Sequence, residues 1–118
     1  MTVIDWLLDG DAAIRWQVMR DLTDTPDAEV ASERARVARE GAGATLLSLQ
    51  ADDGKWGGAE WKHNTWDSTM HALWLLRDFG LDPAGPEAKH ALQLVREHVV
   101  WTNPPVAAGN TFFAGETE

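Results

Sequence analysis

Residues 50–56 read Gln-Ala-Asp-Asp-Gly-Lys-Trp, and this short stretch decides how the chain around it folds. Leucines at helical spacing precede it and a longer amphipathic pattern follows it, so it joins two helices. Gln50 is placed to cap the last carbonyls of the first helix or to bridge to a neighbouring helix. Gly54 turns the chain, and the ring of Trp56 is expected to fold back over the hairpin. The stretch therefore predicts a structural turn between packed helices.

The rest of the chain also has helical spacing, and no segment shows the two-residue alternation of a strand. Thr25-Pro26 is expected to begin a third helix with a capping hydroxyl and a proline in its first turn, and Gly80 to end a later one. The third helix carries an alanine stripe suited to close packing, at Ala28, Ala31, Ala35 and Ala38. The predicted helices cover residues 2–8, 11–22, 26–40, 44–50, 66–79 and 86–102.

The composition excludes several classes of protein. Ten basic residues against nineteen acidic ones give a net charge of −9, which repels phosphate backbones and anionic lipids, so nucleic-acid binding is not expected. No apolar run is long enough to span a bilayer, so no integral membrane segment is predicted. The chain has no cysteine and its first residues do not resemble a secretory signal, which favours a cytoplasmic location.

The residues around the turn resemble two related families. Residues 50–56 match the Gln-x3-Gly-x-Trp repeat of squalene and oxidosqualene cyclases, although Thr45 stands where that repeat prefers an aromatic residue. Trp56-Gly-Gly, followed by Ser-Thr-x-x-Ala-Leu-x-x-Leu over 68–76, resembles the repeat of protein prenyltransferase β-subunits. Both families share the α/α-toroid fold, in which helical hairpins form an inner and an outer ring. The resemblance covers residues 35–100.

This resemblance implies a single all-α domain over residues 1–118, in which stacked antiparallel helical hairpins form an open arc of an α/α toroid. Residues 1–24 resemble a HEAT-type helix pair, and residues 25–100 form the toroid-type repeat. Residues 101–118 read as a C-terminal loop that ends inside the repeat pattern. An open arc leaves an apolar edge, which a second copy or a partner chain is expected to cover.

The resemblance carries over no catalytic residues. Cyclases of this type protonate their substrate with an Asp-x-Asp-Asp motif, which this chain lacks, because Asp52-Asp53 lies in the turn itself. Protein prenyltransferases bind zinc through Asp, Cys and His, and this chain has no Cys. A closed toroid of a dozen helices also needs well over twice this length, at roughly 25 residues per helix and loop. We therefore expect no cofactor and no independent catalysis.

The most site-like group of residues surrounds the start of the 66–79 helix: Trp61, His63, Trp66, Asp67 and Trp74. In the toroid interpretation this end of an inner helix points toward a central cavity, where the indoles bind a ligand and Asp67 serves as a general acid or a hydrogen-bonding anchor. The alternative is that Trp66 and Trp74 belong to the core and that Asp67 caps the helix. By analogy with the family, Phe112, Phe113 and Glu116 would join the same rim.

The chain has four histidines that could serve as metal ligands. His63, Asp67 and His71 follow one another at intervals of four residues, a spacing that suits ligands on one helix face, but a further ligand at suitable spacing is lacking, so no metal site is predicted. His90 and His98 lie on the polar side of their helix and are expected at the surface.

Three functions are consistent with these residues. The first is a toroid-type helical-repeat protein without catalysis of its own, which binds an apolar isoprenoid-like ligand. The second is a helical-repeat module that packs its tryptophan-rich face on a partner protein. The third is part of a terpene cyclase or prenyltransferase completed by further sequence or by another chain. An enclosed pocket lined by Trp61, Trp66 and Trp74 would favour the first, and a flat aromatic face the second.

Overall fold

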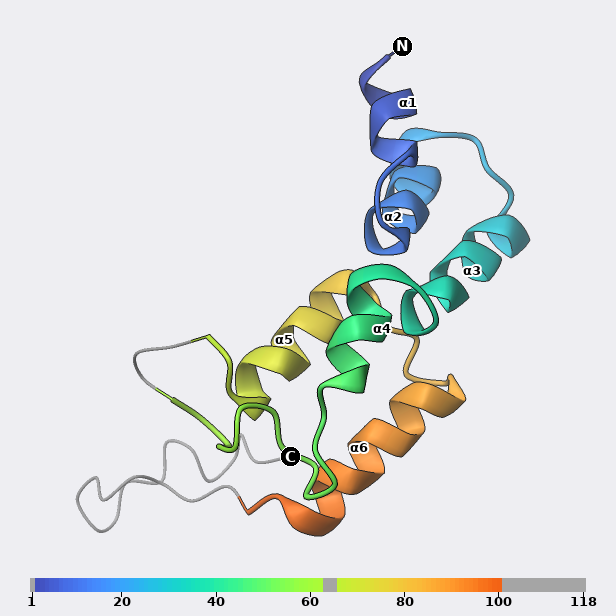
Figure 1. Cartoon of the computed structure of the whole chain (residues 1–118). Helices are drawn as coiled ribbons and strands as arrows, with labels where there is room; N and C mark the ends of the chain where they lie inside the picture. The colour runs from blue at the N-terminus through green and yellow to red at the C-terminus, as the bar shows by residue number, and fades with distance from the viewer. Residues whose placement is uncertain (1, 63–65, 101–118) are drawn as a thin grey trace, which may run out of the picture.

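The computed structural model describes residues 2–62 and 66–100, and the regular elements in these ranges are helices (Figure 1). An isolated bridge between Trp56 and Ala59 is the one β-type pairing among the described residues. The prediction of an all-α chain is therefore confirmed, and the toroid arrangement of the hairpins stays a prediction. The elements are α1 (Val3–Leu8), α2 (Ala12–Leu22), α3 (Asp27–Ala35), the 3-10 helix η1 (Arg36–Ala38), α4 (Gly41–Ser48), α5 (Thr69–Phe79) and α6 (Pro86–His98).

Several helix ends follow the local signals in the sequence. The Thr2 side chain accepts a hydrogen bond from the Asp5 amide at 3.1 Å, and the Asp5 carboxylate accepts one from the Thr2 amide, which closes a capping box at the start of α1. These hydrogen bonds to Thr2 lower the pKa of Asp5. At the end of α5, Gly80 adopts a left-handed conformation with φ of +86°. The predicted glycine stop is therefore confirmed.

The third predicted helix differs most from its expectation. It ends at Ala35, passes through η1 and is followed by α4, which begins three residues earlier than predicted. Thr25 does not cap α3, because its hydroxyl pairs with that of Thr23 at 2.5 Å. The alanine stripe was also the wrong packing face, since Ala28 and Ala31 are exposed. Val30 and Val37 are instead the buried core residues of this segment.

The molecule is elongated, with principal extents of 56 × 25 × 22 Å, and it has two apolar clusters along its length. The first cluster joins the turn and the last two helices: Trp56, Ala72, Leu76, Ala91, Val95 and Val99. The second joins α2, α3 and η1: Ala12, Trp16, Val30 and Val37. The arrangement places the α1–α2 hairpin at one end of the molecule and α6 at the other (Figure 1).

Trp16 connects the N-terminal hairpin to the end of α5. Its indole N–H donates to the Phe79 carbonyl at 2.8 Å, and its ring lies so close to Gly80 that a Cβ there would fall 2.1 Å from a ring carbon. The guanidinium groups of Arg20 and Arg34 lie 4.6 Å and 4.9 Å from the ring centroid, within cation–π range. Arg34 also donates to the Gly80 carbonyl at 2.7 Å. The left-handed glycine thus serves both to end α5 and to admit Trp16.

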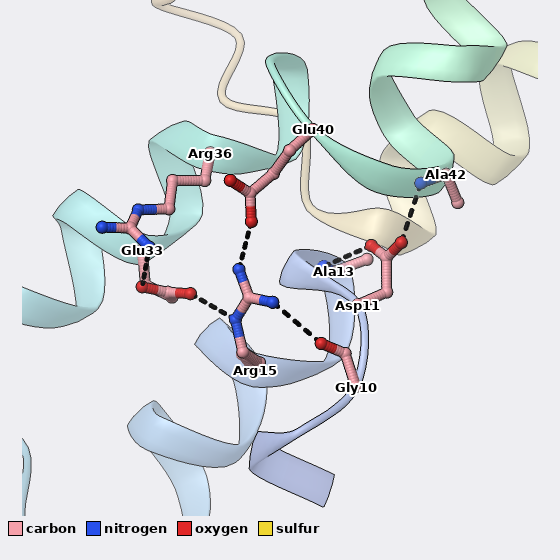
Figure 2. A network of polar contacts seen from close by, with 8 residues as sticks. All are labelled: Gly10, Asp11, Ala13, Arg15, Glu33, Arg36, Glu40 and Ala42. Carbon is pink, nitrogen blue, oxygen red and sulfur yellow. Dashed lines mark hydrogen bonds and ion pairs between the residues drawn. The ribbon is translucent and has the colours of Figure 1, made fainter.

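A polar network fixes α2 against α3 and α4, and Figure 2 shows its members. Arg15 donates to the Glu33 carboxylate, to the Glu40 carboxylate and, at 2.8 Å, to the Gly10 carbonyl. The hydrogen bond that Arg15 donates to Glu33 raises the pKa of Arg15 above its ordinary value, and the one that it donates to Glu40 adds to this effect. The guanidinium therefore stays charged and ties together three segments that are far apart in the sequence.

Asp11 caps two helices at once. One carboxylate oxygen accepts a hydrogen bond from the Ala13 amide at 3.0 Å, in the first turn of α2. The other accepts one from the Ala42 amide at 2.7 Å, in the first turn of α4 (Figure 2). Gly41 permits this approach, because a Cβ there would lie 2.2 Å from the carboxylate. Asp11 therefore caps both α2 and α4.

Because it caps two helices, we expect Asp11→Ala to lower the free energy of unfolding by about 2 kcal/mol, at roughly 1 kcal/mol per lost cap. Urea unfolding followed by circular dichroism measures the change. Asp24→Ala removes the same charge from an exposed position and should change stability by less than about 0.5 kcal/mol. Equal losses in the two variants would show that net charge, rather than capping, is responsible.

Within residues 2–62 and 66–100, no helix has the length and apolar character required to cross a membrane.

Candidate functional site

The structure separates the members of the predicted tryptophan cluster. Trp61 is partly buried in the loop before α5, whereas Trp66 is 81% exposed and Trp74 is 42% exposed. His63, Phe112, Phe113 and Glu116 lie outside the described residues. Helix α5 begins at Thr69, three residues later than the sequence predicted, so Trp66 lies in the loop before it. The interpretation of Trp66 and Trp74 as fully buried core residues is therefore wrong.

A histidine lies between the two exposed indoles. The ring of His71 is tilted by 57° against Trp66 at a centroid distance of 4.8 Å, and it meets the edge of Trp74 at 5.5 Å. His71 itself is 6% exposed, since the two larger rings cover it. The three side chains form an aromatic ladder on the outside of α5. Such a ladder presents a polarisable surface rather than an enclosed cavity.

The hydrogen bond between Ser68 and His71 resembles a nucleophile and its base, with the Ser68 hydroxyl 2.7 Å from His71 Nδ1. Ser68, however, is fully buried, at 0% exposure, so a substrate cannot reach its hydroxyl. It stands at the N-cap of α5, three residues before His71. The pair therefore orders the first turn of α5 and orients the imidazole between the indoles.

Asp67 does not occupy a helix start. The first amides of α5 are taken by loop carbonyls, since Thr69 donates to Ala59 and Met70 donates to Glu60, both at 3.0 Å. These carbonyls accept the hydrogen bonds that a capping side chain would otherwise accept, so the prediction that Asp67 caps the helix is wrong. The Asp67 carboxylate is 61% exposed and lies 3.3 Å from the Lys62 ammonium group. Asp67 is therefore a surface carboxylate bound to a lysine.

The turn residues hold the loop to three helices. The Gln50 amide donates to the Gly54 carbonyl at 3.1 Å and to the Ala91 carbonyl of α6 at 3.0 Å, so it closes the turn and bridges to a neighbouring helix, and neither acceptor is one of the last carbonyls of α4. The Trp56 indole N–H donates at 2.7 Å to the Leu46 carbonyl, which lies in the last turn of α4. The Trp56 amide donates at 3.1 Å to the Thr69 hydroxyl at the start of α5. These contacts are structural, and they shape the region next to the apolar groove described below.

An apolar groove between α5 and α6 was not predicted from the sequence. It encloses about 290 Å³, and its walls are mostly aliphatic. On the α6 side the lining includes the short side chains of Ala88 and Ala91. Arg34 and Arg77 supply the charged part of the lining. The lining residues are Arg34, Leu73, Leu76, Arg77, Leu81, Pro83, Ala88, Ala91 and Leu92.

The groove and the aromatic ladder lie on different sides of α5. Leu73, Leu76 and Arg77 follow the three- and four-residue spacing of one helix face and line the groove. Trp74 is two residues before Leu76, which places it roughly 200° away around the helix. The sequence shows the short side chains of Ala88 and Ala91, but it does not show that they line a groove. The depth of the space, however, depends on how α5 and α6 are spaced.

The remaining polar candidates do not form a metal site within the described ranges, where no group of three or more His, Asp or Glu side chains is placed to bind a metal ion. His71 lies against the two indoles, and His63 is outside those ranges. His90 and His98 are exposed on α6, which confirms their predicted surface position.

A comparison with family models, curated proteins and solved structures finds no match to this chain.

Proposed function

We propose that this chain is a toroid-type helical-repeat protein without catalysis of its own, and that it binds an elongated apolar ligand of the isoprenoid kind in the α5–α6 groove. The observation that carries the proposal is the groove itself, a mostly aliphatic space of about 290 Å³ between α5 and α6. Its volume is at the lower end of the roughly 300–1,000 Å³ of small-molecule sites, which suits a narrow chain more than a fused-ring compound.

Leu92 supports this proposal. It lines the groove and is 40% exposed, so a ligand lying between the helices would cover apolar surface that water now contacts. Covering such surface is the main driving force for binding apolar molecules, at roughly 25 cal/mol for each Å² removed from water. Leu73 and Leu76 form the opposite wall, so the ligand would contact aliphatic side chains on both sides.

The chemistry of the site favours binding over catalysis. The two acid–base candidates near α5 are Asp67, which is exposed and paired with Lys62, and the Ser68–His71 pair, whose hydroxyl is buried. Neither belongs to the groove lining. The groove therefore offers contact area and shape, and its lining includes no carboxylic acid that could protonate a double bond.

The direct test is to measure the binding of farnesol, a neutral isoprenoid alcohol, to the full chain by isothermal titration calorimetry. We expect Leu92→Asn to raise the dissociation constant by about tenfold or more, because the amide group replaces an apolar contact and loses bound water when the ligand covers it. Leu75→Asn is the matched control, since Leu75 is 43% exposed on α5 and is not part of the groove lining. It should change the constant by less than about twofold.

Two outcomes would overturn the proposal. If the wild-type chain binds no farnesol up to its solubility limit, the groove is not an isoprenoid site. If Leu75→Asn and Leu92→Asn weaken binding equally, the ligand binds elsewhere, and the aromatic ladder becomes the first candidate, because Trp74 precedes Leu75 on α5.

A further inference from the structure

Helix α1 carries apolar side chains that the rest of the described structure does not cover. Five of its six residues are apolar, yet none is buried, and Val3 and Trp6 are 71% and 64% exposed. A helix of this length is not stable in water without help, and here the Thr2–Asp5 capping box and packing against α2 provide it. Its apolar side chains therefore add little to the core and remain available at the surface.

The exposed apolar surface continues on α2, where Ile14 is 45% exposed and Leu22 is 55% exposed. The two helices form the hairpin at one end of the molecule, and α6 lies at the other end (Figure 1). Single exposed leucines are common, but several large apolar residues gathered on one short hairpin are typical of an interaction surface. This surface is thus distinct from the groove, and the inference below goes beyond the proposed function.

The hairpin is also strongly acidic. Residues 2–24 contain five aspartates and two arginines, and both arginines are already paired. Arg15 binds Glu33 and Glu40, and Arg20 binds Asp21 at 2.7 Å. Asp5, Asp9 and Asp24 are exposed around the apolar side chains. The surface thus combines apolar contact area with negative charge.

This negative charge determines which kind of partner can cover the apolar side chains of the hairpin. A second copy of the chain would bring a net charge of −9 and the same aspartates against the surface, and an anionic membrane would repel them in the same way. We infer that the α1–α2 hairpin docks a basic amphipathic helix of a partner protein, whose apolar stripe covers Val3 and Trp6 and whose lysines or arginines face the exposed aspartates. Helices of this kind bind through apolar anchors at intervals of three and four residues.

A synthetic leucine–lysine peptide with helical spacing is a suitable probe, labelled with a fluorophore and titrated with the full chain in an anisotropy assay. We expect Trp6→Ser to raise the dissociation constant by about tenfold, because tryptophans are among the residues that contribute most to the binding energy of protein interfaces. Trp66→Ser is the matched control, since Trp66 is more exposed than Trp6 but lies outside the hairpin. It should leave the constant within about twofold.

The contribution of the exposed aspartates to peptide binding can be measured separately. Asp9→Asn/Asp24→Asn keeps the apolar side chains, and we expect it to reduce the dependence of peptide binding on salt concentration, whereas Asp52→Asn in the distant turn should not. Equal effects of Trp6→Ser and Trp66→Ser would overturn the inference. So would equal binding of a leucine–glutamate peptide, binding of the chain to anionic vesicles through Trp6, or a dimer of the chain that Trp6→Ser dissociates.

Discussion

Replacing Trp56 with alanine should unfold a large fraction of the molecules under conditions where the native chain is folded. Trp56 is 3% exposed and packs against Ala72, Leu76 and Val95, so its removal leaves a cavity between α5 and α6. It also leaves the Leu46 carbonyl at the end of α4 without the indole N–H that now binds it. Deleting a buried aromatic ring costs about 3–5 kcal/mol, which is a large part of the stability of a small domain.

Urea unfolding followed by far-ultraviolet circular dichroism measures this loss, with Trp66→Ala as the control. Trp66 is 81% exposed, so the same substitution there should change the free energy of unfolding by less than about 0.5 kcal/mol. Trp56→Phe separates the two parts of the effect, because it keeps most of the apolar volume but loses the hydrogen bond to Leu46. If Trp56→Ala and Trp66→Ala unfold at the same urea concentration, the turn does not anchor the core.

The sequence predicted those parts of the fold whose causes lie within a few residues. The end of α5 at Gly80 depends on neighbours within one helical turn. The turn at 50–56 belongs to this group, because Gln50 reaches the Gly54 carbonyl four residues away. Local chemistry of this kind is visible in the order of the residues alone.

Helix ends set by distant groups could not be predicted. The first turn of α4 is held by Asp11, thirty-one residues earlier in the chain, so a helix start was missed at Gly41. The start of α5 is fixed by the carbonyls of Ala59 and Glu60, which no side-chain pattern reveals. In both places the capping group comes from a loop, and the position of that loop is a consequence of the tertiary fold.

The candidate site was predicted less well than the fold, for a geometric reason. The buried residues Ala72 and Leu76 fix which side of α5 faces the core, and Trp74 lies two residues from each of them, roughly 200° around the helix. That relation was available in the sequence and would have placed Trp74 outside. The α5–α6 groove was not, because its size depends on the spacing that Trp56 imposes between the two helices.

Gly54→Ala should be the most damaging change in the turn that removes no side chain. Gly54 has a φ of +81°, which costs an L-residue roughly 1–2 kcal/mol, and an added Cβ would also lie 2.6 Å from the Leu94 carbonyl oxygen of α6. The turn and α6 would have to separate, which strains the Gln50 hydrogen bond to Ala91 and opens the Trp56 core. We expect a total loss of about 2–5 kcal/mol in the free energy of unfolding.

Gly58→Ala isolates the contribution of close packing from that of the backbone. Gly58 has a φ of +72°, similar to that of Gly54, but nothing lies within 4 Å of an added Cβ. The two variants therefore share the cost of the left-handed conformation, and only Gly54→Ala pushes against α6. The difference between their unfolding free energies measures how tightly the turn is held to α6. A difference near zero would mean that the turn can move away from α6 without loss of stability, and the close contact between Gly54 and the Leu94 carbonyl would then not hold the two together.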